Sequence, residues 1–438
     1  MKYDGLKSHI SNEHFGGPVA ILFRMICLVA AALTLTAFIA VAQDEPNEPD
    51  RSGKTIELPN GEGKVDVQRA CGLCHSLNRI AEANFDRDDW DELVHRMVSF
   101  GAPMKKERIP VVIDYLASNF KGEGRPVGEV IPGSVNATVK EWPIPTPGSR
   151  PHDAYFAPDG YVWYTGNMVN LIGRFDPKSE QFKEFPLKHS NSGPNGLVSD
   201  RAGNIWFTAE TGAYIGKLNP KTGAVTEFPL QDSSLILHTP IFDQKGVLFF
   251  TVLIGNKVGR LNPKTGEIKL GSVPTPMGDP YGIVVNSKGV PFFTERDAPN
   301  LGSIDPETME VTEYRLPNPK IGPRRIAVDS KDVVWYTDSG RGYLGRYDPK
   351  SGSWKEWPSP SGPRSFPYGI NVVKDIVWYA EAEAKPNLIV RFDPMTEKFQ
   401  TWRVPSGGGR IRMLSPAPNG DLWFVGGGSN TLGVVHFN

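Results

Sequence analysis

The chain has 438 residues, of which 39% are hydrophobic and 22% charged, so it is long enough for more than one unit with its own core. Its 48 basic and 49 acidic residues give a net charge of −1, a balance that argues against nucleic acid as a partner. The 46 glycines and 39 prolines favour many turns and therefore many short strands.

The first 42 residues have the features of an export signal. Arg24 precedes an apolar run over residues 25–42, which ends in Ala40-Val41-Ala42, a small-x-small pattern typical of a cleavage site. The run is also about long enough to span a bilayer, so an uncleaved membrane anchor is the alternative. We therefore expect residues 1–42 to be a signal peptide or anchor, residues 43–51 a polar spacer, and the remainder an exported, periplasmic chain.

The sequence Cys71-Gly-Leu-Cys74-His75 has the spacing of a c-type haem attachment site. Two thiols at this spacing can each add to one vinyl group of a porphyrin, and His75 then lies close enough to bind the iron. A redox disulfide or half of a zinc site would also fit a Cys-x-x-Cys pair. No second pair completes a zinc site, because the remaining cysteine, Cys27, lies in the leader. The motif predicts one covalent haem c, with iron and haem contacts from Cys71, Cys74 and His75.

Three short helices are expected around this motif. Residues 64–70 lead into the cysteines, and residues 88–100 and 106–120 carry apolar side chains at helical spacing. These helices define a small all-α domain over residues 52–121, in which a porphyrin would supply much of the apolar core.

This region resembles the class I c-type cytochromes, many of which end in Met-Pro-x-Phe-Gly followed by a last helix with Tyr-Leu. The chain reads Met97-Val-Ser-Phe100-Gly101 and then Tyr115-Leu116. The resemblance implies that Met97 is the sixth iron ligand, opposite His75, which suits an electron carrier. The chain departs from the family in two ways, because valine replaces the usual proline and the stretch from His75 to Met97 is short.

Other assignments for the sixth ligand remain open. Met97 can equally be a core residue of its helix, Met104 is the competing ligand, and His95 is a third candidate.

Residues 138–438 are periodic, after a linker over residues 122–137 that is rich in Gly, Pro and Val. An aromatic residue begins a short hydrophobic strand seven times, at intervals of 43 residues for five steps and 45 for the last. A period of this length with several short strands predicts a β-propeller blade, and seven repeats predict seven blades. The aromatic residues are Trp163, Trp206, Phe249, Phe292, Trp335, Trp378 and Trp423.

The two ends of the periodic region predict how the ring closes. The last repeat stops at residues 432–436, one strand short, and the missing strand type precedes the first repeat at residues 139–144. We expect this N-terminal strand to complete the seventh blade, which removes a free sheet edge. The fold class is therefore a small all-α cytochrome c domain followed by an all-β seven-bladed propeller.

The repeat resembles the streptogramin B lyase (virginiamycin B lyase) family over all seven blades, in phrases such as Pro194-Asn-Gly-Leu and Gly203-Asn-Ile-Trp-Phe-Thr. The resemblance implies a lyase that opens a cyclic depsipeptide by elimination, using a histidine from a late Pro-His-Gly turn together with glutamates and magnesium. The corresponding late positions here hold Tyr368 and Arg412, and Pro151-His152 has the right local sequence but lies in the first blade.

Equivalent positions in a radial fold converge on its axis, so one residue per blade is expected there. These residues are His152, Asn195, His238, Tyr281, Arg324, Tyr368 and Arg412. Acids follow the aromatic strand of successive blades at Glu295, Asp338 and Glu381, with Glu210 one place out of register. The interpretation is a polar funnel that binds a small molecule, with magnesium as a candidate for the carboxylates. An ordinary solvated channel mouth is the alternative. The candidate site comprises His152, His238, Glu295, Arg324, Asp338, Glu381 and Arg412.

The sequence favours an exported electron carrier whose propeller docks a redox partner protein or binds a small ligand. The alternative is a magnesium-dependent C–O lyase of the streptogramin B lyase type with an appended cytochrome domain. An oxidoreductase that passes substrate electrons to the haem is a third hypothesis, and no catalytic residue is assigned from the sequence.

Overall fold

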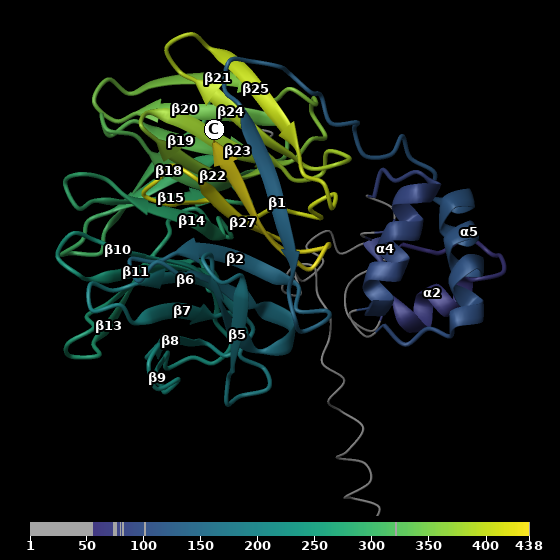
Figure 1. Ribbon diagram of the computed structural model, residues 1–438, viewed down its shortest axis with the longest axis horizontal. Coiled ribbons are helices and arrows are strands. Elements are labelled where there is room, and N and C mark those ends of the chain that lie inside the picture. Colours follow the sequence, from purple (N-terminus) through teal and green to yellow (C-terminus); the bar gives the residue numbers. More distant parts are fainter. Residues whose placement is uncertain are drawn as a thin grey trace, which may run out of the picture. The chain divides into compact units, whose positions relative to one another are not determined.

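The computed structural model describes residues 56–72, 77–78, 80, 83–99, 102–319 and 322–437. Within these residues a group of short helices is followed by seven four-stranded sheets (Figure 1). The expected leader and spacer, residues 1–51, lie outside the described residues. None of the described helices is both long and apolar enough to cross a membrane.

The helices lie where the sequence predicts them, to within about one residue at their ends. They are α2 (Lys64–Ala70), α4 (Arg87–Ser99), the 3₁₀ turn η1 (Lys106–Arg108) and α5 (Ile109–Asn119). The α-helices α2, α4 and α5 pack together in one apolar cluster, to which they contribute Val67, Val94 and Val112. That these helices form a cytochrome remains a prediction.

Glycine is required where α2 approaches α5. Gly63 precedes α2 with φ 104°, a conformation that side chains with a Cβ rarely adopt. A Cβ at Gly63 would lie 2.8 Å from Cβ of Tyr115 in α5. The Tyr115 hydroxyl donates a hydrogen bond of 2.6 Å to the carbonyl of Pro59, which fixes the segment before α2. The first and last helices are therefore tied together at one crossing point.

The sheets confirm the seven-bladed propeller. Each blade is an antiparallel sheet whose first strand contacts the first strands of its neighbours, so the first strands line the axis. The first strands are β2 (Pro151–Phe156), β6 (Pro194–Ser199), β10 (Ile236–Phe242), β14 (Pro280–Val285), β18 (Pro323–Val328), β22 (Pro367–Val373) and β26 (Ser415–Pro416). The second strands are β3 (Val162–Gly166), β7 (Ile205–Ala209), β11 (Leu248–Ile254), β15 (Pro291–Glu295), β19 (Val334–Asp338), β23 (Ile376–Glu381) and β27 (Leu422–Gly426).

The outer half of each blade completes the pattern. The third strands are β4 (Leu171–Asp176), β8 (Tyr214–Leu218), β12 (Lys257–Leu261), β16 (Asn300–Ile304), β20 (Tyr343–Asp348), β24 (Leu388–Asp393) and β28 (Thr431–Phe437). The outermost strands are β5 (Gln181–Pro186), β9 (Val225–Pro229), β13 (Ile268–Ser272), β17 (Val311–Arg315), β21 (Ser353–Pro358), β25 (Lys398–Arg403) and β1 (Ala137–Pro143). A short 3₁₀ turn, η2 (Asn167–Val169), follows β3.

The ring closes as predicted. β1 pairs antiparallel with β28, from Ala137 opposite Phe437 to Pro143 opposite Thr431, and the seventh sheet has the order β1-β28-β27-β26. The strand begins two residues before the expected start at residue 139. The N-terminal strand therefore joins the first and last blades of the propeller without a covalent link.

In six of the seven blades, an aromatic ring of the second strand packs over a glycine of the third strand, and in the sixth blade Val390 takes the place of the glycine. Tyr164 lies over Gly173, and Phe207 lies over Gly216, so closely that a Cβ at either glycine would overlap the ring. Trp163 and Phe207 belong to one buried cluster, which shows that neighbouring blades share their cores. The aromatic repeat seen in the sequence is thus the packing layer between blades.

The expected linker is bound to the sixth blade. Ile131 and Thr401 of β25 exchange two hydrogen bonds, one from Ile131 N to Thr401 Oγ1 (2.7 Å) and one from Thr401 N to Ile131 O (3.0 Å). Gln400 donates to the carbonyl of Val135 (2.6 Å). Residues 131–135 therefore follow the edge of this blade.

A candidate binding and catalytic site at the propeller axis

The axial residues lie at an interruption of the first hairpin in six blades. In each, the pairing of the first and second strands skips two residues, for example between Pro151 and Ala154. Such irregularities turn side chains out of the sheet and often lie beside functional sites. The first of the two skipped residues in each of these blades is an axial residue expected from the sequence. These residues are His152, Asn195, His238, Tyr281, Arg324 and Tyr368.

Threonines hold these interruptions in place. Thr251 of β11 accepts a hydrogen bond from the backbone N–H of Thr239 in its own blade (3.0 Å) and donates one to the carbonyl of Tyr281 in the next blade (2.7 Å). Each threonine therefore couples its own interruption to that of the following blade. The same pair of bonds is made by Thr165, Thr208, Thr294 and Thr337.

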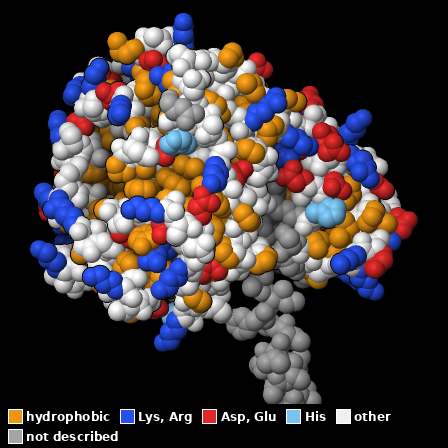
Figure 2. All heavy atoms as spheres, in the orientation of Figure 1, with side chains coloured by type: hydrophobic (Ala, Val, Ile, Leu, Met, Phe, Trp, Pro, Cys, Tyr) orange, Lys and Arg blue, Asp and Glu red, His pale blue; other side chains and the backbone are white. Residues whose placement is uncertain are grey.

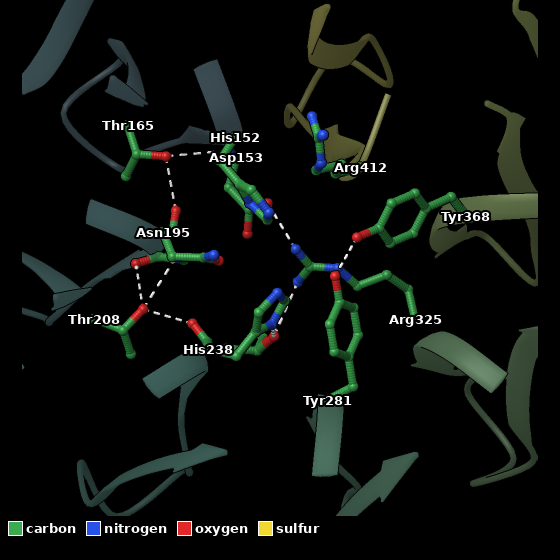
Figure 3. A network of polar contacts seen from close by, with 12 residues as sticks. His152, Asp153, Thr165, Asn195, Thr208, His238, Tyr281, Arg325, Tyr368 and Arg412 are labelled. Carbon is green, nitrogen blue, oxygen red and sulfur yellow. Dashed lines mark hydrogen bonds and ion pairs between the residues drawn. The ribbon is translucent and has the colours of Figure 1, made fainter. Parts of the chain in front are cut away.

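Aromatic and imidazole rings form a continuous group at the axis (Figure 3). The ring centroids of His152 and His238 are 5.4 Å apart, and those of His238 and Tyr281 are 3.8 Å apart. The hydroxyl groups of Tyr281 and Tyr368 share a short hydrogen bond. Asn195 donates through Nδ2 to Glu210 (2.9 Å). The structure thus brings residues of five blades into one buried cluster.

The second skipped residues of the first, third and fifth blades form a belt across the axis. Arg325 donates from Nη2 to Oδ1 of Asp153 (2.7 Å) and from Nη1 to Oγ1 of Thr239 (3.1 Å). Asp153 also contacts Nδ1 of His152 (2.9 Å), and Thr239 contacts Nδ1 of His238 (2.8 Å). Arg325 therefore fixes both axial histidines through their neighbours.

In the second, fourth and sixth blades the second skipped residue is a glycine, because the backbone of the next blade lies where a side chain would be. A Cβ at Gly196 would lie 2.9 Å from the carbonyl oxygen of His238, and one at Gly282 would lie 2.7 Å from that of Arg324. Gly369 is approached in the same way by the backbone of Arg412 and Met413. Side chains therefore reach the axis at this level from the first, third and fifth blades and not from these three.

Three buried arginines, Arg296, Arg325 and Arg412, lie in this interior together with buried acids such as Asp153. On the surface seen in Figure 2, basic and acidic side chains are interspersed. Burial lowers the pKa of His238 well below its usual value, and nearby charge adds to the effect, first from Arg325, then from His152, Arg296 and Arg324. His238 is therefore neutral at neutral pH. Burial raises the pKa of Asp153, while attraction to Arg325 and to Arg412 opposes this rise.

The remaining axial arginines have distinct surroundings. Arg324 donates from Nε to Ser339 (3.1 Å), and its guanidinium lies 5.3 Å from the ring centroid of Tyr281. Arg296 pairs with Asp279 (3.2 Å). Arg412, from the loop before β26, is 2% exposed, and its Nε has no hydrogen-bond partner.

Two of the acids expected at the mouth of the funnel, Asp338 and Glu381, accept hydrogen bonds from residues of nearby loops. Asp338 accepts bonds from the backbone N–H groups of Gly322 and Gly340 and from Arg341, and Glu381 accepts from Ser359 and Ser361. Loop residues thus satisfy both carboxylates where the sequence analysis expected ligand contacts.

Glu295 also lies outside the axial cluster. It accepts a hydrogen bond from Asn300 (2.9 Å), and burial, followed by the nearby Glu313, raises its pKa to about 7. Among the described residues no three His, Cys, Asp or Glu side chains form a cluster that fits a metal ion. The magnesium expected from the resemblance is therefore not matched by a described ligand set.

The predicted haem residues lie only partly within the described structure. Cys74 and His75 lie outside the described residues, whereas Cys71 follows the last residue of α2 and packs against the helical apolar cluster. Met104 packs against the same cluster, and Met97 is half-buried on α4. His95 is exposed, with Nδ1 2.9 Å from the carbonyl oxygen of Asp91.

Sequence reasoning missed the belt of Asp153, Thr239 and Arg325. A signal was available, because the residue after each axial position is glycine in alternate repeats and polar in three of the others. The threonine that follows the aromatic pair in five repeats was the second signal.

Comparison with known proteins agrees with this architecture. The profile of the virginiamycin B lyase family matches residues 127–296 and 280–438, and no match was found among curated proteins. A streptogramin B lyase structure is 26% identical, with a TM-score of 0.64, over 69% of this chain and 98% of that chain. Selenomethionine-substituted virginiamycin B lyase from Staphylococcus aureus is 22% identical, with a TM-score of 0.63, over 68% and 99%. A catalytically inactive histidine-to-alanine variant of that lyase with quinupristin is 21% identical, with a TM-score of 0.62, over 68% and 99%. With seven blades and a family match over most of its length, the chain belongs to the virginiamycin B lyase family.

Proposed function

We propose that the propeller is a C–O lyase that acts at its axis, with His152 as the general base. The observation that carries the proposal is the contact of 2.9 Å between Nδ1 of His152 and Oδ1 of Asp153, in a buried cluster that also contains two tyrosine hydroxyl groups. A carboxylate that accepts the Nδ1 proton holds imidazole in the tautomer whose Nε2 is basic. Membership of the lyase family and the 26% identity to a streptogramin B lyase support this class of reaction.

The elimination would proceed without water. His152 Nε2 takes the proton from the carbon next to a carbonyl group, and the electron pair of that C–H bond forms a carbon–carbon double bond. The bond between the β-carbon and the ester oxygen breaks, and its electrons leave with the oxygen as a carboxylate. Negative charge that develops on the substrate would be stabilised by the axial guanidinium groups in a site of low dielectric constant.

The base lies in a different blade from the one implied by the family resemblance. The late positions of this chain hold Tyr368 and Arg412 and no histidine. His152, in contrast, combines burial with a carboxylate partner. His238 is the second imidazole, and its neighbour Thr239 offers a hydroxyl group where His152 has a carboxylate.

Turnover of a streptogramin B antibiotic such as quinupristin, in the presence of magnesium, tests the proposal. Mass spectrometry should detect a linear product whose mass equals that of the substrate. His152→Asn should reduce kcat by roughly 10²- to 10⁴-fold, whereas His189→Asn, at a partly exposed outer position, should not. Absence of a ring-opened product, or equal kcat in the His152 and His189 variants, would exclude His152 as the base of this reaction.

We propose as a second function that the helical part carries one covalent haem c, through Cys71 and Cys74, with His75 and Met97 as iron ligands. The sequence motif and the position of Cys71 against the apolar helical cluster favour it. Haem would supply single-electron transfer to a redox partner protein in the periplasm, to which the leader would direct the chain.

Expression with a c-type maturation system tests the haem proposal. The purified chain should show haem absorption that survives denaturation, because thioether bonds are covalent, and Cys71→Ser should weaken the attachment. A colourless protein from a maturation-competent host would reject this second function and leave the lyase proposal unaffected.

A further inference from the structure

We propose that the axial cluster contains a carboxylate-binding site with Arg412 as its cation. The guanidinium of Arg412 is buried, and one of its hydrogen bonds, from Nη1 to the carbonyl of Arg410, measures 3.3 Å. Its Nε has no partner. Arginine offers five N–H donors, and a buried charged group without enough acceptors is costly. A ligand that accepts these bonds would remove that cost.

The charges around Arg412 favour an anion from outside the chain. Asp153, a carboxylate that Arg412 attracts, is already bound by Arg325 at 2.7 Å and by His152 at 2.9 Å. No acidic side chain in the described part of the propeller forms an ion pair with Arg412. A carboxylate suits this position because its two oxygens match the paired N–H groups of a guanidinium.

Arg412 lies beside the start of the first blade, which carries the proposed base. Figure 3 places Arg412 between the strand that carries His152 and Asp153 and the ring of Tyr368. A Cβ at Gly427 would overlap Nη1 of Arg412 and lie 3.3 Å from the carbonyl oxygen of Pro151, the residue before His152. Glycine at this point therefore lets the guanidinium lie against the start of the first blade.

A second unpartnered polar atom narrows the class of ligand. Oδ1 of Asn195 is buried and has no hydrogen-bond partner, although Nδ2 of the same side chain is bound to Glu210. Figure 3 shows this amide directed toward the axis. An acceptor at this place suits a hydroxyl or amide N–H on the ligand, and the aromatic rings of Tyr281 and Tyr368 belong to the same axial cluster. The preferred ligand is a small carboxylic acid with a planar body and a hydrogen-bond donor.

This site also fits the chemistry proposed above. Elimination from an ester releases a carboxylate, so Arg412 would bind the leaving group and stabilise the charge that forms on its oxygen. That assignment to the leaving group rests on the proposed lyase function, whereas the binding of a carboxylate does not.

The full chain and pairs of ligands that differ only in charge provide the test. Isothermal titration calorimetry with benzoate against benzamide, and with acetate against acetamide, measures the contribution of the carboxylate. Because the carboxylate would form a charge-assisted hydrogen bond with the Arg412 guanidinium, we expect each carboxylate to bind at least roughly 10-fold more tightly than its amide. Arg412→Gln should abolish this difference, Arg412→Lys should retain part of it, and Arg346→Gln, on the outer strand β20, should leave it unchanged.

Unfolding temperature gives a readout that does not depend on turnover. Benzoate should raise the midpoint of the wild type and not that of Arg412→Gln. Equal affinity for carboxylates and amides in the wild type, or an unchanged preference in Arg412→Gln, would overturn the site. Carboxylate binding without elimination of any ester would retain the site and reject the lyase, whereas elimination that benzoate does not inhibit would overturn the leaving-group assignment.

Discussion

Arg325 of the fifth blade and Asp153 of the first blade form a buried ion pair across the propeller axis, with Nη2 2.7 Å from Oδ1. The side chains are 3% and 4% exposed, so water does not screen the pair. The two residues are 172 positions apart in the sequence and meet because the blades are arranged in a ring. This contact gives the first of five predictions.

Loss of either partner should destabilise the propeller. Arg325→Met leaves the buried Asp153 without its ion-pair partner, and we expect the free energy of unfolding to fall by about 3–5 kcal/mol. Urea unfolding measures this change. The matched control is Lys355→Met, which breaks an ion pair with Glu397 whose side chains are 44% exposed and should cost less than about 1 kcal/mol. Equal effects of the two substitutions would contradict the importance of the axial pair.

The threonines between blades should contribute through hydrogen bonds rather than through volume. Thr251→Val keeps the shape of the side chain but leaves the N–H of Thr239 and the carbonyl of Tyr281 unsatisfied in a buried position. We expect a loss of about 1–3 kcal/mol in thermal or chemical unfolding. Thr251→Ser retains the hydroxyl group and should lose less. Equal unfolding free energies of the Thr251→Val and Thr251→Ser variants would contradict this explanation.

Glu295 should make stability depend on pH. Burial raises its pKa from 4.5 in the unfolded chain to about 7 in the folded one, so the folded state binds a proton more tightly. The stabilisation is fully present below about pH 4.5 and is lost as the pH rises toward 7, by about 1–3 kcal/mol. Glu295→Gln should remove this dependence, and the exposed Glu307→Gln should not. Unfolding measured from pH 4.5 to 8 would contradict the assignment if both variants retained the wild-type slope.

Removal of the closing strand should open the ring. A chain that begins at residue 145 lacks β1 and leaves one edge of β28 unpaired, whereas a chain that begins at residue 122 retains both β1 and the segment bound along β25. We expect a lower unfolding midpoint and more aggregation for the shorter chain, because an exposed strand edge pairs with other molecules. Light scattering and calorimetry of the two chains compare them directly. Identical behaviour would show that the closure is dispensable.

The sixth haem ligand can be assigned by substitution in the mature, haem-loaded chain. Met97→Ala should remove the sulfur-to-iron charge-transfer band of the oxidised protein and lower its reduction potential. Met104→Ala should preserve the band. If the band instead persists in Met97→Ala and disappears in Met104→Ala, the ligand is Met104, which packs against the same apolar cluster as Cys71.

Much of the propeller could be predicted because its sequence repeats. The spacing of Trp163 and its equivalents fixes the second strand of each blade, and the unpaired residues 139–144 indicate the closure. The first axial residues, such as His152 and His238, follow from the same register. The helices were also placed correctly, since their apolar residues recur at helical intervals.

The finer contacts could not be read from the repeat. Glu381 was expected at the axis because it ends a second strand, but the serines that bind it belong to the loop after the previous blade. Arg325 was overlooked because its partners, Asp153 and Thr239, lie in other blades. Contacts that depend on which loop folds over which strand end are not encoded in the spacing of a single blade.

The two-residue interruption in six blades separates the chemistry of the axis from the stability of the sheets. Strand pairing resumes at residues such as Ala154 in all six blades, although the skipped residues differ from blade to blade. Exchange of the first residue of such a dipeptide would therefore alter the inner lining while the surrounding ladders persist, whereas the glycines at the second residue must stay. Evolution could diversify specificity within this scaffold by short local replacements, and a designer could build libraries at the same places.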